Sequence, residues 1–349
     1  MARIQQYFAC SVVLISAWLW PQCSHAQAQE SMLFELTTDA RSAALGGVIG
    51  AHWTGDLHAA AYNPVLLDSS YSGQVAIDYM NYFAGMDLAS VNYAFLPTEK
   101  GQGQIGARFV NFGSFDELDA AGNDLGSFKG GEEIIYFGWK HNVDTTWSLG
   151  VQVFTGSRHL DREIAWWAGA ECFAQGTWPQ RKLAAGVLIS GFGHQWGWKG
   201  MQPTGWLPYN LQLSVTKGFQ NAPFSLFIKS NHLEHWDIAP AGTYDDGYDP
   251  LTGAIVENKT FVFGDQFLRH LKAGTEISLG GNSRLWLGFD YRRRAEMKAA
   301  GRTGTNGFSI GTAFQVGKFE MRVSRNTYHF AGSTTHLGIL FNPRTFQIQ

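Results

Sequence analysis

Apolar residues recur at every second position through most of this chain of 349 residues, from about Gln74 onward. Because successive side chains of a β-strand point to opposite faces, this period predicts strands with one apolar and one polar face. Lys272, for example, lies between Leu271 and Ala273. Other clear segments lie at 147–153, 285–292 and 319–324. The chain is therefore expected to be all-β.

Composition indicates whether the apolar faces meet a buried core or lipid. Charged residues make up only 16% of the chain, against about 25% in soluble domains, and aromatic residues reach 14%. Mean hydropathy is nevertheless only −0.15. Beyond the amino-terminal segment no run of about 18 apolar residues occurs, which excludes a helical membrane protein. The sequence therefore favours a transmembrane β-barrel, and the net charge of −3 gives no reason to expect nucleic acid as a partner.

The alternating segments predict an antiparallel barrel of about fourteen strands. Most segments run for about 8 to 12 residues, which suits tilted strands that cross a bilayer in about 9–11 residues. The strands are expected to start near Gln74, Ser90, Gly103, Glu133, Thr145, Glu163, Lys182, Asn210, Pro223, Leu268, Ser283, Gly307, Lys318 and Thr334.

The connections between these segments alternate in length, as in outer-membrane barrels with short periplasmic turns and longer outer loops. Tight turns are predicted after even-numbered strands, at 141–144, 220–222, 280–282 and 316–317. Long connections are predicted after odd-numbered strands, at 114–131, 191–207, 232–267 and 293–306. A soluble sandwich would not be expected to sort its connections in this way.

Residues 1–28 are predicted to be a cleaved signal peptide. Arg3 supplies a positive start, and the apolar stretch 8–20 is shorter than the ~20 residues of a bilayer-spanning helix. Ala26 and Ala28 form an A-x-A-like cleavage site. We therefore expect an exported protein in the outer membrane of a Gram-negative bacterium.

Residues 29–72 are predicted to form a plug inside the periplasmic mouth of the barrel, which is expected to occupy 73–349. The alternative is a flexible periplasmic extension, but the Ala-rich, low-charge composition favours packing.

Two short helices are expected within this plug. The first covers 40–45, with a cap at 37–39 and an end at the glycine pair 46–47. The second covers 56–62 and is stopped by the Asn-Pro pair at 63–64.

Three motifs resemble functional sites but lack the structural context that those sites need. The G-x-G-x-x-G at 101–106 leads from a turn into a strand, so no dinucleotide site is predicted. The G-x-S-x-G at 307–311 continues a strand, so Ser309 is expected to be a lumen-facing hydroxyl, with an outer-membrane hydrolase as the alternative. His232 and His235 lack the spacing of a zinc site. We therefore predict no catalytic, cofactor-binding or metal-binding residue.

Charged residues on the polar faces are expected to point into the lumen, because a charge that faces lipid costs about 2–4 kcal/mol at the midplane. There they are predicted to pair with one another and with the plug, in a network that holds the plug in place. The alternative is a solvated channel lining. The candidate residues are Asp39, Arg41, Arg108, Lys272, Glu276, Asp290, Arg292, Glu320 and Arg322.

Several stretches resemble the PorQ family, outer-membrane components of the type IX secretion system of Bacteroidetes. The segments that distinguish this family are F-L-R-H at 267–270 and Y-R-R-R-A-E at 291–296. The stretches at 40–47 and 63–64 also occur in the related PorV and FadL-like barrels. The resemblance implies a FadL-like barrel of about 14 strands with no enzymatic activity and no cofactor.

The resemblance also implies a role beside PorV, PorU and PorZ in the complex that attaches cargo proteins to surface lipopolysaccharide. The first hypothesis is therefore a barrel that docks these partners through its outer loops. The connection 232–267 is the candidate contact surface, because Trp236, Tyr244 and Tyr248 could supply aromatic interface anchors. The alternative is a FadL-like channel for small hydrophobic molecules, which predicts an apolar lumenal path and a kink in the wall.

Overall fold

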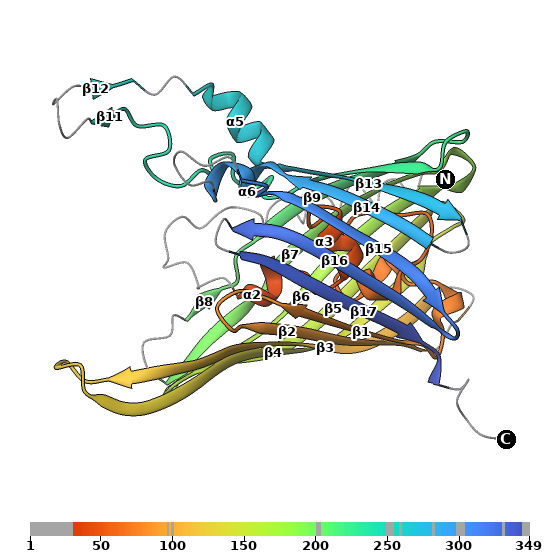
Figure 1. Ribbon diagram of the computed structural model, residues 1–349. Helices are drawn as coiled ribbons and strands as arrows, with labels where there is room; N and C mark the ends of the chain where they lie inside the picture. Colours follow the sequence, from red (N-terminus) through yellow and green to blue (C-terminus); the bar gives the residue numbers. More distant parts are fainter. Residues whose placement is uncertain are drawn as a thin grey trace, which may run out of the picture.

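The computed structural model describes residues 31–95, 98, 101–199, 204–248, 255–257, 260–280, 283–297, 304–329 and 332–343. Over these residues, 14 antiparallel strands close into a barrel around a plug of short helices (Figure 1). The predicted all-β barrel with an amino-terminal helical plug is therefore confirmed. The predicted signal peptide, 1–28, lies outside the described residues.

The barrel strands follow one another around the wall in chain order. They are β1 (Val75–Asn81), β2 (Asp87–Phe95), β3 (Gly101–Leu118), β4 (Asp124–Asn142), β5 (Trp147–Leu160), β6 (Glu163–Trp178), β7 (Leu183–Lys199), β9 (Asn210–Gly218), β10 (Phe224–Ser230), β13 (Leu271–Gly280), β14 (Ser283–Asp290), β15 (Phe308–Val316), β16 (Phe319–His329) and β17 (Gly332–Phe341). The barrel closes where β1 pairs with β17. The 3-10 turn η3 (Pro179–Arg181) connects β6 and β7. Several strands begin at the predicted residue, among them β6, β9 and β14.

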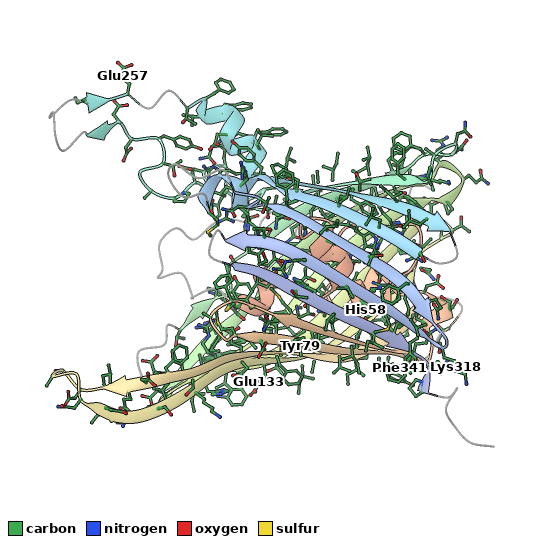
Figure 2. All side chains as sticks on the ribbon, in the orientation of Figure 1. His58, Tyr79, Glu133, Glu257, Lys318 and Phe341 are labelled. Atoms are coloured by element: carbon green, nitrogen blue, oxygen red, sulfur yellow. The ribbon has the colours of Figure 1, made fainter. Side chains whose placement is uncertain are left out.

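Successive residues of a strand face the membrane and the lumen in turn. On β1, Ile77 and Tyr79 are 43% and 40% exposed, whereas Asp78 and Met80 are buried. Figure 2 shows Tyr79 on the outer surface and the plug residue His58 inside the barrel. An apolar outer face around a polar interior is the reverse of the arrangement in a soluble protein. Such an arrangement is stable where lipid surrounds the outer face.

The wall is higher on one side of the barrel than on the other. β3 and β4 run for 18 and 19 residues, whereas β9 and β10 run for 9 and 7. Two predicted long connections are therefore wrong. The segment 114–131 is a strand hairpin that projects from the barrel (Figure 1), and much of 191–207 continues β7, beside which β8 (Gly205–Trp206) pairs. These glycine-rich and polar segments continue the β-ladder because a strand beyond the lipid needs no apolar face.

The other long connections carry helices. Between β10 and β13 lie β11 (Gly247–Tyr248), β12 (Ile255–Val256) and α5 (Val262–Arg269), and β14 is followed by α6 (Tyr291–Glu296). β13 starts after the predicted Leu268 because α5 occupies that residue. These connections emerge opposite the tight turns, at what we call the outer end (Figure 1). None of the helices in the described ranges is long and apolar enough to cross a membrane.

The plug, residues 31–72, occupies the lumen. Its elements are α2 (Met32–Glu35), α3 (Ala40–Ala44), α4 (Leu57–Ala60), η1 (Pro64–Leu66) and η2 (Ser69–Tyr71). The two predicted helices are present in shorter form. They begin after Asp39 and Asp56, whose carboxylates accept hydrogen bonds from backbone N–H groups of the first turn.

Glycines in the wall allow α3 to pack closely against it. Gly274 and Gly288 are register partners on β13 and β14. A Cβ at position 288 would lie 2.1 Å from the backbone nitrogen of Gly46, and one at Gly311 would lie 2.7 Å from the Cβ of Ala44. Gly46 has a φ of 81°, which only glycine adopts readily, and it ends α3 as predicted.

Candidate functional site in the lumen

Charged side chains of the plug and the wall meet at Asp56, the capping residue of α4. Arg322 of β16 contacts both carboxylate oxygens of Asp56, at 2.9 and 3.0 Å, and Asp39 at 3.4 Å. Arg322 also donates from Nε to Glu320 of the same strand at 2.8 Å. Arg322, Asp56 and Asp39 are almost fully buried. Ion pairing therefore compensates much of the cost of removing these charges from water.

Arg41 of α3 extends this cluster toward β13. Its Nε donates to Glu276 at 2.8 Å, and its Nη1 lies 3.1 Å from Asp56. Glu276 also accepts a hydrogen bond from Trp286 Nε1 at 2.8 Å. The structure thus gathers, around Asp56, the predicted residues Asp39, Arg41, Glu276, Glu320 and Arg322, which we call the plug network. No sequence pattern distinguishes Asp56 as a partner of distant charges, because the nearby signal at 56–62 is that of a helix and a carboxylate at its start has a local role.

Other predicted members lie apart from the plug network. Lys272 and Asp290 are register partners on β13 and β14, and they pair at 3.3 Å nearer the outer end. Arg292 pairs with Glu296 of its own helix at 3.1 Å rather than with the plug. The prediction that Arg292 joins the network is therefore wrong, because the chain enters α6 directly after Asp290.

Arg108 of β3 faces the lumen and contacts the plug, as predicted, but through a carbonyl oxygen and aromatic rings instead of a carboxylate. Its Nη1 donates to the carbonyl oxygen of Leu33 at 3.1 Å. Its guanidinium lies 4.8 and 5.3 Å from the ring centres of Tyr62 and Tyr136, whose π faces attract the cation. The buried Nε and Nη2 have no hydrogen-bond partner within the described part of the chain.

A buried histidine connects the plug to β1. His58 Nδ1 lies 2.7 Å from Asp78 Oδ1. Ligand atoms of Asp39, His58 and Asp78 lie within 4.8 Å of one another. The Asp39 oxygens, however, already accept hydrogen bonds from the N–H groups of Arg41 and Ser42. These hydrogen bonds therefore explain why the three side chains lie close together.

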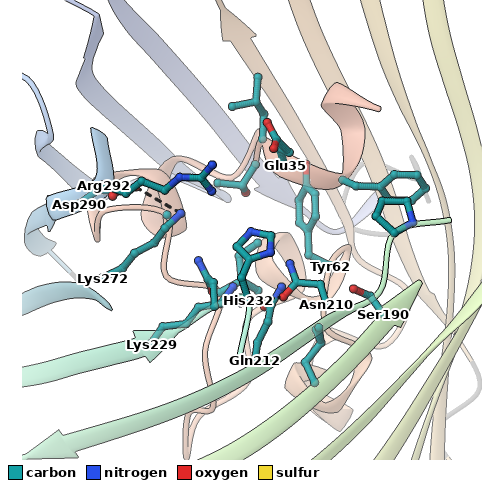
Figure 3. Close-up of a pocket in the computed structure, with 18 of the residues that line it drawn as sticks. Glu35, Tyr62, Ser190, Asn210, Gln212, Lys229, His232, Lys272, Asp290 and Arg292 are labelled. Carbon is teal, nitrogen blue, oxygen red and sulfur yellow. Dashed lines mark hydrogen bonds and ion pairs between the residues drawn. The ribbon is translucent and has the colours of Figure 1, made fainter. Parts of the chain in front are cut away.

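A cavity of about 400 Å³, which we call the outer cavity, lies between the plug and the outer end (Figure 3). This volume lies within the range of about 300–1,000 Å³ that is typical of small-molecule pockets. Apolar and charged side chains share the wall of this cavity, and the plug, the strands and the connections all contribute to it. Its apolar residues include Phe34, Leu36, Ile49, Phe83, Phe154, Leu188 and Leu207.

Two charged side chains face the outer cavity without a direct partner. Lys229 of β10 and Glu171 of β6 are only 6% and 8% exposed. Neither forms an ion pair or hydrogen bond with any residue that the structure describes. Figure 3 shows Lys229 beside Gln212 at one side of the cavity, with the Lys272–Asp290 pair nearby. A buried ammonium without a partner is costly, so it favours an acidic ligand.

The wall beside the outer cavity is kinked where β7 leaves β9. Their pairing ends at Ser190, and the next residue, Gly191, has a φ of 91°. A Cβ at Gly191 would lie 2.2 Å from the carbonyl oxygen of Pro208. Both Gly191 and Pro208 line the cavity. The kink is one of the two features that the channel hypothesis predicts, whereas the predicted apolar path is present only in part of the cavity wall.

The predicted contact residues of the long outer connection differ in their surroundings. Trp236 is 49% exposed and packs against Phe263, with ring centres 5.2 Å apart. The Tyr244 hydroxyl donates to Asp265 at 2.8 Å. The side chain of Tyr248 lies outside the described residues.

Asp265 of α5 holds this connection against α6. It accepts hydrogen bonds from Tyr291 at 2.6 Å and from Arg269 at 2.6 Å, in addition to Tyr244. Partial burial raises the pKa of Asp265, but these donors outweigh it and hold that pKa below its usual range. The hydrogen bond to Asp265 raises the pKa of Tyr291 to about 12. Arg269 also donates to Glu296 at 3.1 Å, so the segments 267–270 and 291–296 are in direct contact.

The three motifs that resemble functional sites occupy strands and a loop. The residues 101–106 belong to β3. Ser309 lies within β15 and donates from Oγ to the carbonyl oxygen of Ala44 at 2.9 Å, which is a contact with the plug. His232 Nδ1 lies 3.2 Å from Glu234.

No family model and no curated protein matches this chain. Among solved structures, the toluene transporter TbuX of Ralstonia pickettii has a TM-score of 0.51 at 11% identity, covering 87% of this chain and 97% of that one. The toluene transporter TodX of Pseudomonas putida has a TM-score of 0.50 at 11% identity, covering 90% of this chain and 98% of that one. At this identity the likeness concerns the fold. The chain therefore has a 14-stranded antiparallel barrel fold like that of these two transporters.

Proposed function

We propose that this chain is an outer-membrane channel for small, mainly apolar molecules that carry one acidic group. The observation that carries the proposal is the outer cavity, a space of about 400 Å³ inside the barrel whose wall is formed in part by apolar side chains. A water-filled pore needs polar walls, so apolar side chains gathered in one part of a lumen favour an apolar ligand. The two transporters that share the fold support the choice of a channel.

The acidic group is inferred from the charges that line the outer cavity. Six cationic side chains face it, namely Arg108, Lys229, Arg269, Lys272, Arg292 and Arg293. Only four acidic ones do, namely Glu35, Glu171, Asp290 and Glu296. Lys229 is the cation that we expect to bind the ligand, because it is buried and, unlike Arg108, forms neither an ion pair nor a hydrogen bond among the described residues. A carboxylate on the ligand would supply a charge-assisted hydrogen bond there.

Calorimetric titration with two matched ligands tests this function. The purified barrel is titrated with 4-phenylbutyrate and with 4-phenylbutanol, which share an apolar body and differ in the acidic group. We expect the acid to bind about tenfold more tightly, because hydrogen bonds to charged groups contribute about 1.5–3 kcal/mol. Lys229→Met should remove this preference, whereas Lys217→Met, which alters an exposed lysine of β9, should leave it intact. If the wild-type barrel bound neither compound, the proposal would be contradicted.

A second candidate function is the docking of type IX attachment proteins such as PorZ, PorU or PorV. One observation favours it: Phe261 and Phe263, at the start of α5, are 75% and 63% exposed on a connection that projects from the barrel. Exposed aromatic rings are effective interface anchors. We expect Phe261→Ser with Phe263→Ser to abolish co-purification of such partners from outer membranes in mild detergent. Phe115→Ser, on the other projecting hairpin, serves as the control, and co-purification unchanged by the double variant would exclude α5 as the contact.

A further inference from the structure

A second cavity lies at the opposite end of the plug. It has a volume of about 520 Å³ and reaches the turn between β4 and β5, since Asn142, Asp144 and Thr145 line it. Its other walls include His52, Val65 and Gln175. We call it the inner vestibule. It faces the end of the barrel where the tight turns lie, which is the periplasmic side in barrels of this kind.

A small void lies between the outer cavity and the inner vestibule and shares residues with both. Ile49, Leu188, Gln212 and Lys229 line both the void and the outer cavity. Val65 and Gln175 line both the void and the inner vestibule. The void itself has a volume of about 10 Å³, which is roughly the space of one water-sized probe. The three spaces therefore form a series along the inner surface of β6, β7 and β9.

From this series we infer that the molecule contains one axial route past the plug, closed at a single constriction by Ile49 and Val65. This inference rests on the proposed channel function, for which it supplies a path and a gate. Two of the wall residues that line the void are small, namely Gly186 of β7 and Ser214 of β9, which are register partners. From the plug, Ile49 and Val65 are the apolar side chains that reach the void.

The plug is bound to the wall by different interactions on its two sides. The side at the constriction is the one that can open. The plug network lies against β13 and β16, where its charges are buried and paired. Beside the constriction, neutral hydrogen bonds replace ion pairs. Ser214 Oγ accepts from the Ala51 N–H at 2.9 Å, and Thr216 Oγ1 donates to the Ala51 carbonyl oxygen at 2.6 Å. Neutral hydrogen bonds contribute less than buried charged ones, so segment 49–54 can shift while the network stays intact.

Electrical conductance across a planar lipid bilayer tests the route without any ligand. In potassium chloride solution, the double variant Ile49→Ala with Val65→Ala should conduct at least severalfold more than the wild-type barrel. The matched control is Leu45→Ala with Val48→Ala, which also shortens two plug side chains. Those side chains pack with Phe227 and Trp286 and line none of the three spaces, so the control should leave conductance unchanged. Heat-modifiable mobility in gel electrophoresis verifies that each variant is a folded barrel.

A third variant tests whether the gate variant raises conductance only because the whole plug is loosened. In the Ile49→Ala, Val65→Ala background, Gln212→Phe should return conductance to the wild-type level, because Gln212 lines the void from the wall side and a larger side chain there refills the space. Equal conductance in the gate and control variants would overturn the route, as would a gate variant that Gln212→Phe does not close. Binding of 4-phenylbutyrate is measured separately. If the barrel binds this acid but the gate variant does not raise conductance, the proposed function stands and the route is contradicted. If the gate variant raises conductance but the barrel does not bind the acid, the route stands and the proposed function is contradicted.

Discussion

Arg322 and Asp56 are separated by 266 positions in the sequence, yet Arg322 Nη1 contacts both Asp56 oxygens, at 2.9 and 3.0 Å. Arg322 belongs to the wall and Asp56 to the plug. Both are almost fully buried. This ion pair therefore fixes the plug against the wall. Arg41 reinforces it through its own contact with Asp56.

Replacement of Arg322 by methionine is expected to destabilise the barrel by about 3–5 kcal/mol, because it leaves the buried Asp56 carboxylate without its main partner. Urea titration of the barrel in lipid vesicles, followed by tryptophan fluorescence, measures the change. The control is Arg162→Met, whose side chain is 80% exposed, and which should change stability by about 0–1 kcal/mol. A loss from Arg322→Met no larger than the loss from Arg162→Met would show that the plug network does not hold the plug.

Substitution of Gly288 by alanine should displace α3, because the added Cβ would lie 2.1 Å from the backbone nitrogen of Gly46. Hydrogen exchange of residues 40–47 should therefore become faster. Gly332→Ala is the matched control, since its Cβ would meet Phe83 at an ordinary 3.4 Å. If both variants exchanged at the wild-type rate, the close packing of α3 on β14 would be disproved.

The apolar outer face predicts a difference between two equally exposed residues. Ile135 of β4 and Leu125 of the projecting hairpin are both 59% exposed. Ile135→Arg places a charge in lipid and should reduce folding stability by about 2–4 kcal/mol. Leu125→Arg lies beyond the lipid and should have little effect. Folding yields into phospholipid vesicles measure both, and similar yields would argue that lipid does not cover the wall.

Acidification is expected to release α5 from α6. The pKa of Asp265 is depressed in the folded protein, so its contribution is present above the ordinary carboxyl pKa of about 3.9 and is lost as pH falls below that value. Tyr291, with a pKa raised to about 12, stays protonated and remains a donor over this range. Hydrogen exchange of residues 262–269, corrected for intrinsic rates, should rise relative to neutral pH.

The variant Asp265→Asn provides the reference for this pH experiment. It should exchange rapidly at neutral pH and lose most of the pH dependence, because the charged acceptor is absent. Asp119→Asn, on the β3–β4 hairpin, should leave α5 unaffected. Equal protection of α5 in the wild type at pH 7 and pH 3 would refute the role of Asp265.

The two outer segments that carry the family resemblance contact each other through Arg269 and Glu296. The sequence presents these segments as two separate runs of charge. The contact indicates that they form one unit of structure at the outer end, whatever partner or ligand the barrel binds.

The sequence by itself determined the features that depend on neighbours along the chain. Side-chain alternation identified the strands, because it follows from the geometry of a single strand. The aspartate at 39 and the glycine at 46 marked the first plug helix, because capping is a local interaction. The low charge and the absence of a long apolar run pointed to lipid as the solvent of the outer face.

Only the tertiary structure decided which charges meet and where space remains. Arg322 and Arg108 look alike as lumen-facing cations, but one reaches Asp56 and the other lies between tyrosine rings. The pairing depends on how the plug packs across the barrel, and no spacing in the sequence encodes that distance. The outer cavity and the constriction at Ile49 and Val65 have the same origin, because a void is defined by atoms from many strands at once.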